Sequence, residues 1–409
     1  MTSTSVSEFP IAAVRARFPA LRAAGDRIVY ADNAAGAQVP DEVLDAVRGH
    51  LTDRNVQRGG RYAESEAVEG MLAGARAALA ELVNAESPEE IVFGLNATSL
   101  IRVVAEAMRP VLRPGDEVVV TELDHEANIG PWLRLGSSGA VPEPWEVHGP
   151  EARLDWDELR GLLSGGRVRI LALPLASNAT GRIVDVARAA ALAREAGALT
   201  FADAVHFAPH GRIDARALGV DFLAFSGYKI FGPHTGFLWG RKKILASLLP
   251  AREFFIPAAP PDAYESGTQN YEGIAGLAGA VRYLRSLDPG GSPAAAMDRI
   301  RAYERGLAGA LVGGLARLPG LTILGDPDPT RAEERVPTVS FRIEGVPAAR
   351  IVQSLAARGI QARDGHMYAP RLLRAAGFDP EEGVARVSLC HYNTPAEIDR
   401  ILEAVRSVG

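Results

Sequence analysis

The sequence predicts an α/β protein with a large domain around a mainly parallel sheet and a smaller C-terminal α+β domain. Two observations carry this prediction. From about residue 88 to 245, short apolar runs rich in β-branched residues alternate with segments of helical periodicity. This order gives parallel strands joined by right-handed crossovers. After about residue 270, long helical stretches come first and alternating helices and strands follow.

The expected strands of the large domain are apolar on both faces, as strands buried inside a parallel sheet are. They lie at residues 90–95, 117–123, 168–177, 199–205 and 221–227. Between the third and fourth run, residues 183–198 place apolar side chains at spacings near 3.6 and predict a helix. Polar clusters follow the ends of the strands, where open parallel sheets bind ligands.

The C-terminal region begins with a predicted helix over residues 271–287, followed by a Gly/Pro linker and a long amphipathic helix that ends near residues 318–320. Strands are expected within 336–345 and 383–392. A capping box of Thr394 and Glu397, with a proline between them, opens the last helix. We therefore place the large domain at residues 26–265 and the small one at 1–25 and 266–409.

Composition limits the function classes. The chain has 409 residues, 47% of them apolar and 23% charged, and a net charge of −6. No basic surface is expected, so nucleic acid is excluded as a partner. The single cysteine, Cys390, excludes an internal disulfide and a multi-cysteine zinc site, and we expect no metal. No long apolar span and no apolar leader are present, which predicts a cytoplasmic protein without membrane contact.

A lysine and an aspartate end neighbouring predicted strands. Asp203 closes the run LTFAD, and Lys229 follows the run DFLAFSG. Pyridoxal phosphate (PLP) needs such a pair, because the amine forms a Schiff base with the aldehyde and the carboxylate keeps the pyridine nitrogen protonated. A close carboxylate–pyridinium pair contributes roughly 4 kcal/mol at an effective dielectric near 20.

A phosphate site is also expected. Asn96, Ala97 and Thr98 stand between a strand and a helix, where backbone amides and the helix dipole favour an anion. Ser226 offers a further hydroxyl just before the lysine. His125, after the next strand, is placed to stack on a ring or to move a proton.

These motifs together resemble a known family. The segments YADNAAGAQVP, NATS, TELDHEANIGPW, SNATG, ADAVH, SGYKIFGP, ESGTQN and RVSLCHYNT are similar to those of the class V aminotransferases. Within that family they look most like SUF-type cysteine desulfurases and selenocysteine lyases. The resemblance implies the PLP-dependent transferase fold of type I, with a sheet of the seven-stranded type, and a homodimer with shared active sites.

The resemblance also implies roles for individual residues. Lys229, His125 and Asp203 would be catalytic, and we add Tyr368, which stands at the place of the family's nucleophile, as a proton donor or an aromatic wall. Cofactor contacts would come from Asn96, Ala97, Thr98, His125, Asn178, Asp203, His206, Ser226, Tyr228, Lys229 and, from the other subunit, Thr268. Substrate contacts would come from Ala35, Arg58, Asn178, Arg363 and Arg386. The loop around Arg58 would cross into the partner's site.

Three departures from the family pattern bear on activity. Tyr368 stands where desulfurases carry a nucleophilic cysteine, Tyr228 replaces a histidine before the lysine, and His206 replaces a glutamine. Cys390 lies in the apolar run RVSLCHY and is expected to be a small buried hydrophobe. The chain therefore lacks the thiol that would accept sulfur as a persulfide.

The favoured reaction is β-elimination on cysteine or a cysteine conjugate, a C–S lyase without an enzyme persulfide. An aminotransferase or an epimerase uses the same residues and remains the alternative. A PLP-binding protein without turnover is a weaker one, because Lys229, Asp203 and Arg386 are all present.

Overall fold

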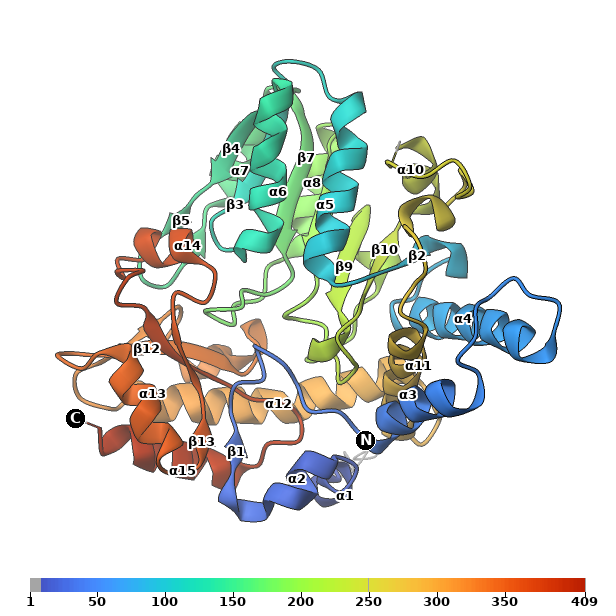
Figure 1. The fold of residues 1–409 in the computed structure, drawn as a ribbon. Coiled ribbons are helices and arrows are strands. Elements are labelled where there is room, and N and C mark those ends of the chain that lie inside the picture. The colour runs from blue at the N-terminus through green and yellow to red at the C-terminus, as the bar shows by residue number, and fades with distance from the viewer. Residues whose placement is uncertain (1–8, 249, 409) are drawn as a thin grey trace, which may run out of the picture.

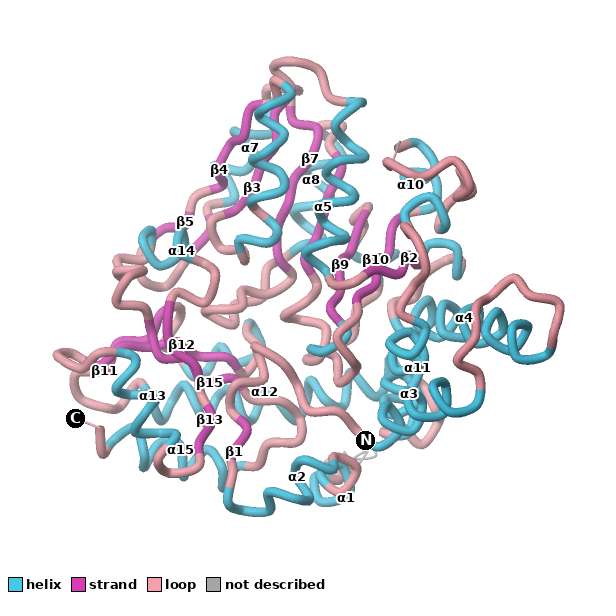
Figure 2. The backbone as a smooth tube through the Cα atoms, in the orientation of Figure 1, coloured by secondary structure: helices cyan, strands magenta, loops and turns pink. Residues whose placement is uncertain are grey.

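The computed structural model describes residues 9–248 and 250–408. Two sheets organise this part of the chain, and helices pack against both (Figure 1, Figure 2). Residues 1–8, with which the predicted N-terminal segment begins, lie outside these ranges.

The large sheet has seven strands in the order β2-β10-β9-β8-β7-β3-β4. Only β10 runs antiparallel to its neighbours, while the other pairs are parallel. The strands are β2 (Ile91–Gly94), β3 (Glu117–Thr121), β4 (Val141–Trp145), β7 (Val168–Pro174), β8 (Leu199–Asp203), β9 (Phe222–Ser226) and β10 (Gly236–Gly240). Five of them fall in the five predicted runs, and the predicted fold class is confirmed.

Helices cover both faces of this sheet, because successive strand residues point to opposite sides. Val118 and Val120 of β3 pack with α5 (Ala97–Met108) and α6 (Gly130–Leu133). Val119 packs on the opposite side with α4, α7 and α8. The bounds are Ala63–Leu82 for α4, Trp156–Ser164 for α7 and Val186–Glu195 for α8; a further helix, α11, spans Tyr271–Ser286.

The C-terminal region is built on an antiparallel sheet of four strands in the order β11-β12-β15-β14. Its strands are β11 (Leu321–Leu324), β12 (Thr338–Ile343), β14 (Arg363–Gly365) and β15 (Val384–Ser388). The helices packed on it are α12 (Pro293–Leu315), α13 (Ala348–Ala356) and α15 (Pro395–Arg406). The predicted capping box is present, since the Thr394 side chain accepts the Glu397 N–H.

The N-terminal part of the chain joins this small sheet region rather than the large sheet. Strand β1 (Val29–Tyr30) pairs in parallel with β13 (Ile360–Gln361), and Asp32 forms a parallel bridge with Ser388. The domain boundaries at residues 25/26 and 265/266 stay a prediction, although β1, which falls within the predicted large domain, pairs with a strand of the predicted small domain.

The remaining elements are short or peripheral. Helices are α1 (Ile11–Arg15), α2 (Pro19–Ala24), α3 (Asp41–Asp53), α9 (Ala215–Leu218), α10 (Lys242–Ser247) and α14 (Pro370–Ala375); the strands β5 (Val147–His148) and β6 (Arg153–Leu154) form a two-stranded sheet. Turns of 3₁₀ helix are η1 (Gly25–Arg27), η2 (Pro88–Glu90), η3 (Arg109–Val111), η4 (Glu126–Asn128), η5 (Arg134–Ser138), η6 (Gly227–Lys229), η7 (Asp262–Tyr264) and η8 (Pro329–Glu334). Within the described ranges, no helix is both long and apolar enough to cross a bilayer.

Two predicted positions need correction. Lys229 does not end a strand: β9 stops at Ser226, and Lys229 is the last residue of the turn η6. Cys390 is not on the same strand as Arg386, because β15 ends at Ser388. The Cys390 N–H instead donates a hydrogen bond to Oδ1 of Asn393 at 2.8 Å. This contact belongs to the turn that follows the strand.

Candidate active site

A cavity of about 430 Å³ opens beyond the carboxyl ends of β8 and β9. Nine of the predicted site residues line it: Ala97, Thr98, His125, Asn178, Asp203, His206, Ser226, Tyr228 and Lys229. Four further residues that the sequence reasoning did not select complete the lining, namely Asp124, Ala127, Ala176 and Val205. The cavity therefore brings together residues from five segments, which follow β2, β3, β7, β8 and β9.

Lys229 is the only lysine in this cavity lining, and its side chain is buried, with 9% exposed. Burial and the nearby Arg386 guanidinium lower the pKa of Lys229 to about 8, while Asp203 acts in the opposite direction. A lysine amine with a depressed pKa is a better nucleophile at neutral pH, because more of it is uncharged.

Two buried carboxyl groups line the cavity together with this lysine. Asp203 accepts the Val205 N–H at 2.8 Å, and burial raises the pKa of Asp203 to about 6. Asp124 accepts hydrogen bonds from the Asn128 amide and from the N–H of His125, both at 2.7 Å. Burial, and then the charge of Asp203, raise the pKa of Asp124 well above its usual range. One of the two carboxyl groups can thus stay protonated while the other, as a carboxylate, faces a cationic ligand ring.

The start of α5 has the features expected of an anion site. Asn96 caps the helix by accepting the Ser99 N–H at 2.9 Å, and the Ala97 N–H points to the Ser226 hydroxyl at 3.2 Å. This approach requires glycine at position 236, because a Cβ there would lie 2.7 Å from the Asn96 Cα. Asn96, Ala97 and Ser226, which the sequence places in a phosphate site, therefore lie together at one helix N-terminus, a geometry that favours phosphate.

His125 lies beside the cavity with a fixed tautomer. Its Nδ1 accepts the Ala127 N–H at 3.0 Å, so the neutral ring carries its proton on Nε2. Burial, together with Lys229 and Arg386, lowers the pKa of His125 to about 4. The ring is therefore uncharged at neutral pH and can stack or pass a proton.

Two lining residues have buried polar atoms without a partner in the described residues. These are Nε2 of His206 and Oδ1 of Asn178, although the other end of the Asn178 amide donates to the Met367 carbonyl at 2.7 Å. Buried polar atoms are rarely left unpaired in native proteins. Together with the lysine, the carboxyl groups and the anion site, these atoms fit a polar aromatic phosphate such as PLP.

The predicted substrate residues Arg386 and Arg363 lie side by side on β15 and β14, as directly paired positions. Arg386 is buried, and its Nη1 donates to the Asn178 carbonyl at 3.0 Å. Arg363 is exposed. Both are bound to the carboxylate of Asp32, which the sequence did not single out because its partners are remote in the chain. Ala35, with Asp32 and Arg363, lines a neighbouring hollow.

Tyr368 lies at the mouth of the site. Its ring centroid is 5.4 Å from that of His125, and 61% of the residue is exposed. Met367 and Tyr368 both have positive φ values, 53° and 56°, which are costly for residues with large side chains. The Tyr368 carbonyl accepts the Glu126 N–H at 2.9 Å and fixes the segment against the His125 loop.

Two further predicted site residues, Thr268 and Arg58, line neither this cavity nor the neighbouring hollow within the single chain. Thr268 is exposed between η7 and α11. Arg58 is exposed in the connection between α3 and α4 and pairs with Glu69 at 3.2 Å. Their roles in the site of a neighbouring subunit, a cofactor contact for Thr268 and a substrate contact for Arg58, stay predictions.

Cys390 is fully buried, and burial raises the pKa of its thiol well above the usual range. It lies near a cross-domain pair in which His210 Nδ1 and Glu304 Oε2 are 2.7 Å apart. Two ligands of a tetrahedral zinc ion would stand about 3.3 Å apart, so this pair has the spacing of a hydrogen bond. The thiol is inaccessible, as expected from the sequence.

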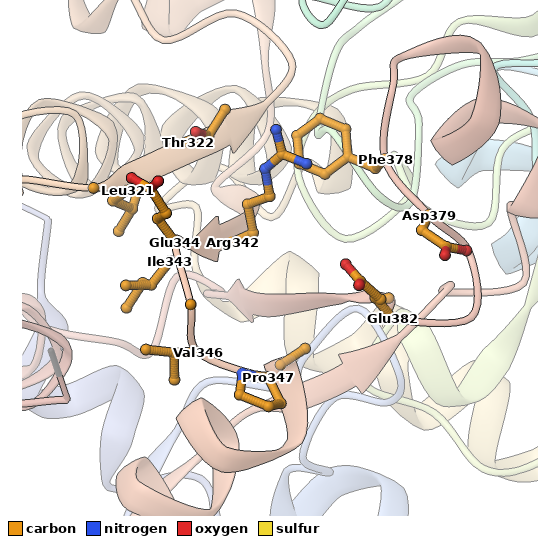
Figure 3. Close-up of a pocket in the computed structure, with 14 residues that line it drawn as sticks. Leu321, Thr322, Arg342, Ile343, Glu344, Val346, Pro347, Phe378, Asp379 and Glu382 are labelled. Atoms are coloured by element: carbon orange, nitrogen blue, oxygen red, sulfur yellow. The ribbon is translucent and has the colours of Figure 1, made fainter.

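A larger hollow, of about 1400 Å³, lies on the small domain (Figure 3). Arg342 stacks over the Phe378 ring at 4.6 Å in it, and the acidic side chains of Glu344, Asp379 and Glu382 are exposed. Exposed charges of this kind are solvated and cost little when unpaired. Size alone therefore does not make it the active site.

Sequence comparison shows which known proteins this chain resembles. The family model described as aminotransferase class V matches residues 29–401. An aminotransferase-like protein of Gibberella zeae is 36% identical over 99% of this chain and 100% of its own length. A cysteine desulfurase of Escherichia coli is 32% identical over 97% of both chains.

Solved structures show the same similarity. The crystal structure of the Escherichia coli cysteine desulfurase superposes with a TM-score of 0.85 at 32% identity and covers 98% of each chain. An apo cysteine desulfurase from Thermococcus onnurineus superposes with a TM-score of 0.87 at 25% identity over 97% of each chain.

Proposed function

Because the chain belongs to the class V aminotransferase family of PLP-dependent enzymes, we propose that it is a C–S lyase. It would act on cysteine or a cysteine conjugate by β-elimination, without an enzyme persulfide. With cysteine the overall reaction consumes one water and gives pyruvate, ammonia and hydrogen sulfide.

The observation that carries this proposal is the inaccessible thiol. Cys390 is the one cysteine of the sequence, is fully buried, and has a raised pKa through burial. A thiol that attacks a substrate sulfur must be exposed and must ionise readily. The segment at the cavity mouth carries Tyr368 instead, and a phenol cannot carry sulfane sulfur.

The residues of the cavity support PLP as the cofactor. The N-terminus of α5 with Ser226 would hold its phosphate. Asp203 would pair with the pyridine nitrogen, and Lys229 would attach the aldehyde. Bound there, PLP supplies an electron sink for a negative charge at the substrate α-carbon.

The protein's own groups would then handle the protons. The Lys229 amine, released when substrate binds, would take the α-proton, because burial keeps its pKa near the working range, at about 8. Arg386 and Asn178 would hold the substrate carboxylate. Tyr368 would protonate the leaving sulfur or serve as an aromatic wall, and Tyr368→Phe separates the two: turnover falls in the first case and stays nearly unchanged in the second.

The alternative is an aminotransferase, or an epimerase with the same residues. One observation favours the aminotransferase: the Gibberella zeae relative, aminotransferase-like by description, is 36% identical over 99% of this chain. In that case no group would leave the β-carbon, and the amino group of the substrate would pass to a keto acid.

The test is to incubate the PLP-loaded protein with a panel of amino acids and to measure pyruvate, sulfide or thiol, and new amino acids in the same samples. Pyruvate with thiol is the expected result. Amino exchange with a keto acid, or inverted stereochemistry, would overturn it in favour of the alternatives. Asp203→Ala should lose nearly all turnover and Asp203→Glu keep some, because charge maintains the pyridinium.

Borohydride reduction followed by peptide mapping tests the attachment itself. A pyridoxyl group is expected on Lys229. A label on another lysine would contradict the assignment whatever the reaction proves to be.

A further inference from the structure

Asp32 occupies a position between the two arginines of the substrate site. Its Oδ1 lies 3.2 Å from Nη2 of Arg386, and its Oδ2 lies 2.9 Å from Nη2 and 3.0 Å from Nε of Arg363. The side chains are 23% exposed for Asp32, 3% for Arg386 and 45% for Arg363. One carboxylate of the chain thus binds a buried and an exposed guanidinium at once.

The backbone forces this arrangement. Arg363 and Arg386 are directly opposite residues of the antiparallel pair β14–β15, and like charges at such positions repel. Asp32 reaches them because its backbone bridges to Ser388, two residues beyond Arg386. Two positive charges and one negative charge leave a single net positive charge.

This cluster belongs to the cavity through Arg386. Its Nη1 donates to the Asn178 carbonyl at 3.0 Å, and Asn178 lines the cavity. The Nε of Arg386 is buried without a partner in the described residues, so one donor of this guanidinium is left for a ligand. The donors of Arg363 that face Asp32 are already used.

We propose that Asp32 is the charge-selecting residue of the substrate site. It neutralises Arg363 and leaves Arg386 for one carboxylate, so the site takes substrates with a single carboxylate. A ligand with two carboxylates could bridge both arginines only by displacing Asp32. This inference rests on the proposed function, because it assigns the arginine pair to substrate binding.

A merely structural ion pair would behave differently. Loss of such a pair would lower the stability of the fold and the affinity for all ligands to a similar extent. Loss of a selecting carboxylate frees a second guanidinium and changes the preference between ligands with one and two carboxylates.

The experiment compares propionate with succinate, which carry no amine and cannot react. Their dissociation constants are measured by calorimetry on the cofactor-free protein and by the absorbance change of the PLP-loaded protein, for wild type and Asp32→Asn. We expect Asp32→Asn to raise the affinity for succinate at least about tenfold relative to propionate. Adding Arg363→Gln to Asp32→Asn should remove that gain.

Asp364→Asn is the matched control, because Asp364 is an exposed neighbour of Arg363 on β14 that has no ion pair to it among the described contacts. It should leave the preference unchanged. If Asp32→Asn folds and binds PLP like the wild type but its succinate-to-propionate ratio stays within twofold, the inference is wrong. Failure of PLP to attach to Lys229 would instead refute the proposed function, while the calorimetry still tests Asp32.

Discussion

The protonation of Lys229 offers a quantitative test of the site. Burial and Arg386 lower its pKa to about 8 from 10.5. At pH 7, about a tenth of the amines would then be uncharged, compared with about one in 3000 for an ordinary lysine, a gain of roughly 300-fold. The shift corresponds to roughly 3.4 kcal/mol between the two protonation states. This gain is what makes the amine reactive toward an aldehyde at neutral pH.

The two charged neighbours should move this pKa in opposite directions. Arg386→Gln removes a cation that lowers the pKa of Lys229, so the pKa should rise. Asp203→Asn removes a carboxylate that raises it, so the pKa should fall. A change caused by altered folding would not reverse its sign between the two variants.

The sequence makes the assay simple, because it holds only three lysines, Lys229, Lys242 and Lys243. Carbon-13 at the lysine Cε gives three resonances in the cofactor-free protein, and their shifts are followed from pH 6 to 11. Lys242 and Lys243 are exposed and serve as internal references. If all three resonances titrate together above pH 10 in the wild type, the reasoning about burial and Arg386 is refuted.

Three more predictions follow from the structure. His391 is buried and its pKa is lowered to about 3 by burial and His210, so only the unfolded chain takes up its proton as pH falls below 6.5. The free energy of unfolding should then drop by about 2 kcal/mol at pH 5 through this residue; His391→Phe should flatten the pH slope in urea unfolding, and an unchanged slope would contradict this. Cys390→Ser should retain most activity, and mass spectrometry after incubation with cysteine should find no persulfide; an adduct on Cys390 with loss of activity in the serine variant would restore a desulfurase. Mixing inactive Lys229→Ala with an inactive Thr268→Ala variant should restore partial activity in a homodimer, whereas a fully active monomer in sedimentation would refute shared sites.

Local patterns in the sequence were sufficient to predict the strands of the large domain and the residues at their ends. Asp203, Asn96 and Ser226 could be placed because each directly follows or precedes an apolar run. The predicted strand end at Lys229 was wrong by three residues, because β9 stops at Ser226 and the 3₁₀ turn that follows it has no periodicity to detect. Cys390 was assigned to a strand since apolar residues continue past Ser388, where side-chain bonding from Asn393 starts a turn instead.

The partners of Asp32 could not be predicted in this way. Its contact with Arg363 spans 331 residues, and nothing in the local sequence indicates a parallel pairing between β1 and β13. Asp124 was not predicted as a site residue for another reason. It stands beside His125 in an evident motif, but only the fold brings it close enough to Asp203 for that charge to raise its pKa.

The pairing of β1 with β13 also orders events during synthesis. The arm that carries Asp32 leaves the ribosome first, but its partner Arg363 follows 331 residues later. At about 5 to 20 residues per second, the arm waits roughly 15 to 65 s without its partner. The central sheet can assemble in that interval, since all of its strands lie between residues 91 and 240. Arg363, Arg386 and Asp32 therefore come together last, so a nascent chain truncated before residue 360 would hold all the lining residues of the cavity at the large sheet but not this ion-pair cluster.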